Sequence, residues 1–299
     1  VQRGACQSVV DRQPRDAVGY YEKALEIQDA LGDRGEQIII LNNLVNVYTA
    51  LERREQARAA LRRAASLREE VADPEGAALL WIELGDRLLE DGLLDDGLLD
   101  GGAGNPRREY ERAARICEEH GDMRGLALAE MHIARSWSRE NQHAIAFRHG
   151  ERALALRIDV GNDKETVAAM GNLALIYDAA GEVQKSLALM ERALDIAERC
   201  NDIDGMRALL KNLGASCMDA DLDEAGIGFY SRALALAEDA NDHMESASIL
   251  ESLGLLHVAV GRRSEGLALM RRALLIYSDM NAADEAEKVL ERLRALDDA

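Results

Sequence analysis

Six histidines are the residues of this chain whose chemistry could bind a metal ion or transfer a proton. Four of them lie within thirty residues of one another, at His120, His132, His143 and His149. A zinc site needs two ligands at positions i and i+4 of one helix, or a close set of cysteines and histidines, and this cluster has neither spacing. We therefore expect no metal site and no cofactor.

The four cysteines, Cys6, Cys117, Cys200 and Cys217, also lack the spacing of a reactive or metal-binding motif. No two of them form a CxxC pair, and no serine or cysteine lies in a strained-turn nucleophile motif. The glycine-rich run 101–104 has no Lys-Ser/Thr pair of the kind that completes a phosphate-binding loop. We predict that the chain is not an enzyme and that its thiols are reduced, as they are in the cytoplasm.

Acidic residues outnumber basic ones by 55 to 36, which gives a formal net charge of -19. Binding to nucleic acid depends on clustered Lys and Arg, so this balance argues against a nucleic-acid partner. The chain also lacks an apolar run of the length, about 18 residues, that could cross a membrane. We expect a soluble protein whose partner is a protein or peptide segment of basic or mixed charge.

Small residues recur along the chain at a fixed interval, which is 40 residues in most repeats. One series consists of alanines: Ala24, Ala64, Ala113, Ala153, Ala193, Ala233 and Ala273. A second series consists of large apolar residues, most of them followed by Gly or Ala: Leu44, Leu84, Ile133, Leu173, Leu213 and Leu253. A large residue beside a small one lets a helix insert a side chain while the neighbouring backbone approaches closely. The two series predict a first and a second helix in every repeat, packed as a hairpin.

Residues that end and start helices separate these predicted helices. The turn inside each hairpin carries residues that mostly tolerate a left-handed backbone, at Glu52, Gly92, Asn141, Gly181, Asp221 and Gly261. Between hairpins a helix stop precedes a capping residue, at Gly32-Asp33, Ala72-Asp73, Gly121-Asp122, Gly161-Asn162, Asn201-Asp202 and Asn241-Asp242. Each helix is therefore expected to begin within a few residues of the end of the preceding one.

These signals divide residues 1–299 into one domain of seven hairpins, at about 1–32, 33–72, 73–121, 122–161, 162–201, 202–241 and 242–281. A capping helix follows at 283–296, and we expect Leu290 and Leu293 to occupy its core positions. Nine extra residues in the third hairpin predict an inserted loop at 93–101. The first hairpin begins without a helix cap, which we interpret as the start of a fragment of a longer protein.

The pattern resembles that of the tetratricopeptide repeat (TPR). The resemblance rests on the large-small pair and on a second series of small residues, Ala57, Ala146, Ser186, Gly226 and Gly266. The 40-residue period, and the Asn-Leu pairs that begin at Asn172 and Asn212, resemble the variety of repeat found in kinesin light chains and in the sensor regions of bacterial STAND regulators. The resemblance covers essentially the whole chain. It implies an all-α fold, a right-handed α-α superhelix whose first helices line a concave groove.

Two residues of the fourth hairpin depart from this pattern. Glu130 occupies a position that is apolar in other repeats, for example at Leu41, and Gly150 occupies a position that is large elsewhere, for example at Tyr110. The fourth hairpin is therefore predicted to be the least well packed, either as a hinge or as a local defect.

The resemblance also implies which residues of the first helices contact a ligand. They are Asn42, Asn43, Asn46, Asp86, Arg135, Arg139, Asn172, Asp178, Lys211, Asn212 and Glu251. An asparagine amide both donates and accepts, so it can bind the backbone of an extended peptide. The carboxylate clamp that holds chaperone tails in this family needs an asparagine four residues after a lysine. In this chain the residue four positions after Lys211 is Ala215, so the clamp is absent. Acids in the third hairpin and arginines in the fourth favour a ligand of mixed charge instead.

We interpret the chain as a protein-binding or peptide-binding scaffold that uses this groove as the sensor or docking region of a larger regulatory protein. Two alternatives stay open. A small-ligand sensor would hold a metabolite in an apolar pocket near Trp81, Trp137, Arg135 and Arg139. A structural module would self-assemble into a homo-oligomer through the loop Leu93–Leu99 or through the face of the first hairpin.

Overall fold

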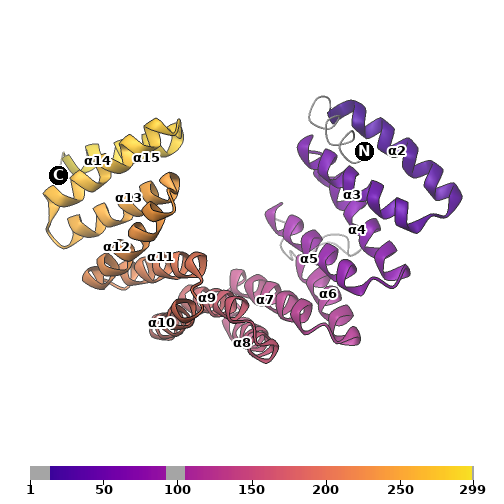
Figure 1. Cartoon of the computed structure of the whole chain (residues 1–299), viewed down its shortest axis with the longest axis horizontal. Helices are drawn as coiled ribbons and strands as arrows, with labels where there is room; N and C mark the ends of the chain where they lie inside the picture. Colours follow the sequence, from indigo (N-terminus) through magenta and orange to yellow (C-terminus); the bar gives the residue numbers. More distant parts are fainter. Residues whose placement is uncertain (1–13, 92–104, 298–299) are drawn as a thin grey trace. The chain divides into compact units, whose positions relative to one another are not determined.

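The computed structural model of the chain describes residues 14–91 and 105–297. Within these two ranges every regular element is an α-helix, fourteen in all, and no strand is present (Figure 1). The predicted all-α class is therefore confirmed. Among the described helices, none has the combination of length and apolar character that a membrane crossing requires.

The chain divides into two compact units, residues 1–156 and 157–299, and the boundary falls inside α8 (His143–Val160). Unit 1 holds most of α8 and the helices α2 (Pro14–Leu31), α3 (Arg34–Ala50), α4 (Arg54–Glu70), α5 (Pro74–Glu90), α6 (Pro106–His120) and α7 (Met123–Arg139). Unit 2 holds α9 (Asp163–Ala179), α10 (Val183–Arg199), α11 (Ile203–Asp219), α12 (Asp223–Asp239), α13 (His243–Ala259), α14 (Arg263–Asp279) and α15 (Ala283–Asp297).

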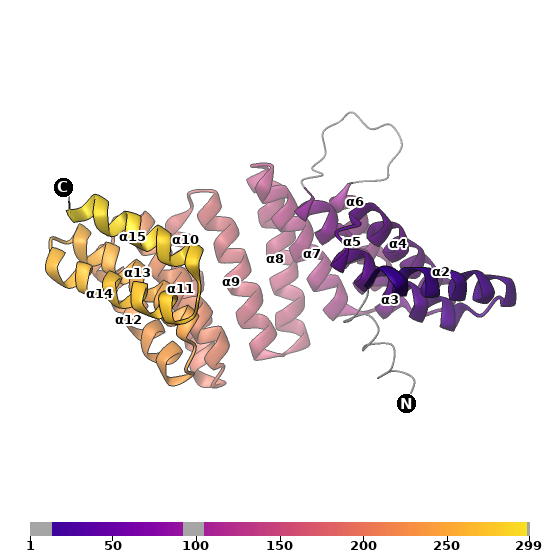
Figure 2. The same cartoon turned by 90° about the horizontal axis from the view of Figure 1, so that it is seen from above.

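Within each unit, consecutive helices pack side by side as hairpins (Figures 1 and 2). The pairs α3/α4, α5/α6, α7/α8, α9/α10, α11/α12 and α13/α14 coincide with the predicted hairpins from 33–72 to 242–281. That these hairpins form one domain stays a prediction. The first helix of the first hairpin and the inserted loop at 93–101 lie outside the described residues.

Side chains that satisfy free backbone N–H groups fix where helices begin. Asp33, Asp73, Asp122, Asn162 and Asp242 each accept a hydrogen bond from the N–H three residues further on, at 2.9–3.3 Å. These five predicted caps are confirmed, and each replaces a bond that the first helical turn cannot make internally. The predicted cap Asp202 makes no such bond.

Left-handed residues end the helices inside the hairpins, as predicted. Glu52, Asn141, Gly181, Asp221 and Gly261 have φ angles between 56° and 84°. The same conformation occurs between hairpins, for example at Ala72 (φ 57°) and Gly121 (φ 72°). Such a residue reverses the chain within a few residues, so neighbouring helices can pack along their whole length.

The small and large residues that recur in the sequence form the core. Ala64, Ala113, Ala153, Ala193, Ala233 and Ala273 are at most 1% exposed. Leu44, Leu84, Ile133, Leu173, Leu213 and Leu253 are at most 3% exposed. The predicted close crossing of first and second helices is therefore present in each of these repeats.

Two details of packing differ from the sequence-based expectation. In α15 the core positions belong to Val289 (0% exposed) and Leu293 (5%), whereas Leu290 is 36% exposed. The prediction for Leu290 was wrong because residues 289 and 293, four apart, share the face that meets α14.

In the fourth hairpin Glu130 is only 2% exposed, so the position that is apolar in other repeats is filled by its side chain. His149 Nδ1 and the Arg152 guanidinium from α8 each lie 2.6 Å from its carboxylate.

Candidate functional site

The eleven predicted binding residues all lie on the first helices of their hairpins, α3, α5 and α7 in unit 1 and α9, α11 and α13 in unit 2. We call the side of these helices that carries them the first-helix face of each unit. Seven have side chains that make no hydrogen bond or ion pair among the described residues: Asn42, Asn43, Asn46, Arg135, Arg139, Asn172 and Asn212. The other four, Asp86, Asp178, Lys211 and Glu251, each bind a neighbouring helix.

Asp86 is held between two side chains of neighbouring helices. Its Oδ1 accepts a hydrogen bond of 2.7 Å from Tyr110 Oη and lies 2.8 Å from His132 Nδ1. Burial acts to raise the pKa of Asp86, but the hydrogen bond and charge of His132, the bond from Tyr110 and the charge of Arg135 hold it below its ordinary value. The same environment, burial first and then the bond to Asp86, raises the pKa of Tyr110. The carboxylate therefore links α5, α6 and α7.

Two arginines of α7 are available charges on the unit 1 face. Glu83 is bound by Arg87 at 2.9 Å, and Asp86 is occupied as described. Arg135 and Arg139 are both exposed on α7, four residues apart, and neither has a polar partner among residues 14–91 and 105–297. Positions four apart in a helix lie on one side, about 6 Å along the axis, so both guanidinium groups can meet one ligand.

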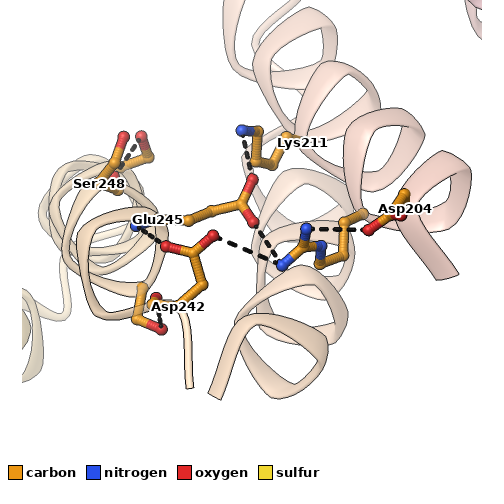
Figure 3. A network of polar contacts seen from close by, with 8 residues as sticks. Asp204, Lys211, Asp242, Glu245 and Ser248 are labelled. Carbon is orange, nitrogen blue, oxygen red and sulfur yellow. Dashed lines mark hydrogen bonds and ion pairs between the residues drawn. The ribbon is translucent and has the colours of Figure 1, made fainter. Parts of the chain in front are cut away.

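In unit 2 a network of ion pairs joins α11 to α13 (Figure 3). Lys211 Nζ lies 2.6 Å from Glu245, and Arg207 lies 3.1 Å from Glu245, 3.1 Å from Asp204 and 3.6 Å from Asp242. Glu245 is only 16% exposed, so its carboxylate depends on these two cations for compensation. Lys211 is consequently committed to a partner inside the protein, which its position in the sequence does not reveal.

Two further predicted residues also act between helices. Asp178 accepts a hydrogen bond of 2.9 Å from Ser216 Oγ, which joins α9 to α11. Glu251 forms an ion pair with Arg292 of the capping helix. Both carboxylates therefore stabilise the stack of unit 2.

The tryptophans predicted to line a small-ligand pocket are covered by other side chains. Trp81 is 1% exposed, its Nε1 donates to Glu69 at 2.6 Å, and the Arg112 guanidinium lies 4.0 Å from its ring centroid. Trp137 carries the Arg107 guanidinium at 3.4 Å from its ring centroid. Arginine stacked on a tryptophan face is a stabilising contact in its own right. Trp81 therefore serves the core of unit 1 and does not line an open pocket.

Reactive groups in the described part of the chain are few. No three residues among His, Cys, Asp and Glu are placed to hold a metal ion there. Cys117, Cys200 and Cys217 are free thiols. Burial, followed by the charge and hydrogen bond of Asp122, raises the pKa of Cys117 to about 12, which keeps this thiol protonated and unreactive at neutral pH.

Sequence reasoning missed the role of Tyr110 as a partner of the first-helix face. Tyr110 lies on α6, a second helix, and is 0% exposed. A Cβ atom on Gly85 would lie 2.4 Å from the Tyr110 ring, so the glycine makes room for the ring, and the ring places its hydroxyl on Asp86. The small residue after Leu84 was visible in the sequence, but the hydrogen bond across three helices was not.

Stacked helical hairpins with core alanines at each crossing define a helical-repeat protein of the protein-interaction class. Residues 38–76 and residues 125–199 each match a family model of the tetratricopeptide repeat. These two ranges are tetratricopeptide repeats. A search of the curated proteins finds no relative in sequence.

Several solved structures share the fold. Nearly identical TPR-like repeats of a kinesin light chain from Podosopora anserina are 16% identical, with a TM-score of 0.54, over 67% of this chain and 94% of theirs. A STAND protein with a TPR sensor from Pyrococcus horikoshii is 16% identical, with a TM-score of 0.62, over 94% of this chain and 42% of its own. A Rap protein complexed with Competence and Sporulation Factor is 14% identical, with a TM-score of 0.56, over 95% of this chain and 80% of its own.

Proposed function

We propose that the chain binds an extended segment of a partner protein on its first-helix faces, as the sensor or docking region of a larger regulatory protein. The observation that carries this proposal is the set of amide side chains left without polar partners. Asn43 and Asn46 lie on α3 of unit 1, and Asn172 and Asn212 lie at equivalent positions of α9 and α11 in unit 2. Each amide can donate to a carbonyl and accept from an N–H of an extended backbone.

The charges of unit 1 indicate a partner of mixed character. Arg135 and Arg139 are free to pair with carboxylates, and Glu83 and Asp86 are already paired with Arg87 and His132. Glu90 of α5 is exposed and has no ion pair among the described residues. Ile39 and Leu79, each 50% exposed at equivalent positions of α3 and α5, add apolar contact area on these helices. The segment should therefore bring acidic and aliphatic side chains to unit 1.

Two of the structural neighbours support a regulatory role, one by its domain content and one by its bound factor. The P. horikoshii protein joins a TPR sensor to a signal-transduction ATPase, and the Rap protein is seen with a bound factor.

The free cysteines favour a reducing, cytoplasmic setting for this chain. In such a setting the buried thiols of Cys117 and Cys217 stay unpaired.

Selection of phage-displayed random peptides on the full chain tests the proposal. Peptides that bind the first-helix face of unit 2 should lose about tenfold in affinity on the Asn172→Ala/Asn212→Ala variant, because each lost hydrogen bond costs on the order of 0.5–1.5 kcal/mol. Gln184→Ala is the matched control, since Gln184 is an exposed amide on the second helix α10. Unchanged affinity of every selected peptide on the asparagine variants of both units, including Asn43→Ala/Asn46→Ala, would remove the proposal.

A further inference from the structure

Ion pairs between successive second helices form a regular series in each unit. The arginine that precedes each core alanine pairs with an acid near the end of the preceding second helix. The pairs are Asp29–Arg63 at 2.5 Å, Glu69–Arg112 at 3.0 Å, Glu118–Arg152 at 2.7 Å, Glu198–Arg232 at 2.5 Å and Glu238–Arg272 at 2.6 Å. We call each of these pairs a rung. All five lie at equivalent positions of the repeat.

One rung lacks its acid. The arginine is present at Arg192 on α10, but the position that holds Glu118 one repeat earlier and Glu198 one repeat later is Ile158. Both residues belong to unit 2. Arg192 makes no hydrogen bond or ion pair with any described residue, and Ile158 is 56% exposed.

The free arginine lies in the wall of a shallow pocket on α10. The pocket has a volume of about 710 Å³ and is lined by Arg192, Asp195, Ile196, Glu198 and Arg199. Glu198 is already paired with Arg232, and Arg199 makes a single bond, from its Nε to the backbone oxygen of Asp195. Two guanidinium groups therefore face this pocket without a carboxylate partner, and Asp195 is its one acid without an ion pair among the described residues.

The chemistry that fits this surface follows from the complete rungs. In each of them the arginine receives a carboxylate from a helix, so the unfilled position at Arg192 matches an acidic residue on a helix from another molecule. Arg192 and Arg199 are seven residues apart, about 10.5 Å along one side of α10, with Ile196 between them. A partner helix with two acidic residues two turns apart and an aliphatic residue between them has the complementary pattern.

We propose that Arg192, Arg199, Ile196 and Ile158 form a second docking surface, separate from the first-helix face, for an acidic amphipathic helix of a partner protein. The partner's carboxylates complete the missing rung at Arg192 and a contact at Arg199. Its aliphatic side chain covers Ile196 and the exposed Ile158.

A fluorescein-labelled, alanine-based helical peptide with two glutamates seven residues apart and a leucine between them is the probe. Fluorescence anisotropy with the full chain should show saturable binding that weakens as salt increases. The same peptide with glutamine in place of both glutamates should bind about tenfold more weakly, because both exposed ion pairs are lost. The original peptide should bind Arg192→Gln about three- to fivefold more weakly, because one ion pair is lost.

A substitution of Ile158 tests the proposal most directly. Ile158→Glu completes the rung within the chain, so it should prevent binding while leaving Arg192 in place. Arg272→Gln is the matched control, since Arg272 is the equivalent residue of a complete rung, and it should leave binding unchanged. The proposal is overturned if the wild type does not bind the peptide, if the glutamate and glutamine peptides bind equally, or if Ile158→Glu binds like the wild type. Circular dichroism spectra of the variants establish that each is folded.

Discussion

Asp86 Oδ1 on α5 lies 2.8 Å from His132 Nδ1 on α7, and the same oxygen accepts the hydroxyl hydrogen of Tyr110. A residue that the repeat pattern places on the first-helix face thus joins three helices of unit 1. The acid contributes to the stability of the stack as well as to the charge of the surface. Arg135 and Arg139 of α7 have no polar partner among the described residues.

The Asp86 interaction should make the stability of the protein depend on acidic pH. The pKa of Asp86 is lowered below its ordinary value of 3.8 in the folded protein, so its ionised form favours folding. The contribution is fully present above that value and is lost as the pH falls through the lower pKa of the folded state. Asp86→Asn should therefore be less stable than the wild type at pH 7, and the difference should shrink as the pH falls below 3.8. Thermal unfolding across this range measures it.

The control for this experiment is Asp239→Asn, since Asp239 is exposed and has no ion pair among the described residues. Its difference from the wild type should not decrease in the same way. A constant difference for Asp86→Asn between pH 7 and pH 3 would contradict the role assigned to its carboxylate.

Two substitutions of Glu130 should have opposite consequences. Glu130→Ala removes the shared partner of His149 and Arg152 and leaves a cavity, which should cost about 1–3 kcal/mol of unfolding free energy. Glu130→Leu restores the apolar residue that other repeats have, and Arg152, 47% exposed, keeps its ion pair with Glu118 and can reach water. The leucine variant should stay within about 1 kcal/mol of the wild type or exceed it. Denaturant titration distinguishes the two, and equal losses would show that the ion pairs are essential.

Gly85 should not tolerate a methyl group. A Cβ atom there would lie 2.4 Å from the fully buried Tyr110 ring, and the ring is held by its bond to Asp86. Gly85→Ala should cost about 1–3 kcal/mol through overpacking. Gly228→Ala in α12 is the comparison, because no atom lies within 4 Å of the added carbon, and it should stabilise the protein by about 0.5–1 kcal/mol. If both variants melt at the wild-type temperature, the close packing of Tyr110 is not limiting.

Ala72 holds a left-handed backbone, with φ of 57°, that costs an L-residue about 1–2 kcal/mol. Ala72→Gly removes this strain, and after allowance for the greater freedom of glycine in the unfolded chain it should stabilise the protein by about 0.5–1 kcal/mol. Gly121, at the equivalent position with φ of 72°, should show the reverse change on Gly121→Ala. The midpoints of urea unfolding measure both, and a loss of stability in Ala72→Gly would contradict the expected relief of strain.

Sequence alone determined the helices, their ends and the phase of their packing. Alanines such as Ala193, large residues such as Leu173 and caps such as Asp33 act within one helix or one hairpin, so their spacing is readable along the chain. The pattern gave the wrong core residue in α15. It predicted that Leu290 is buried, whereas the adjacent residue Val289 is buried and Leu290 is 36% exposed.

Tertiary structure decided which polar residues are free to act. Lys211 and Asp86 follow the same pattern as Arg135, yet the first two are bound to Glu245 and His132 and the third has no partner among the described residues. The rung that Ile158 leaves incomplete likewise appears only when helices one repeat apart lie side by side. Ion pairs of this kind depend on distances between residues more than thirty positions apart, and those distances are set by the packing of the repeats.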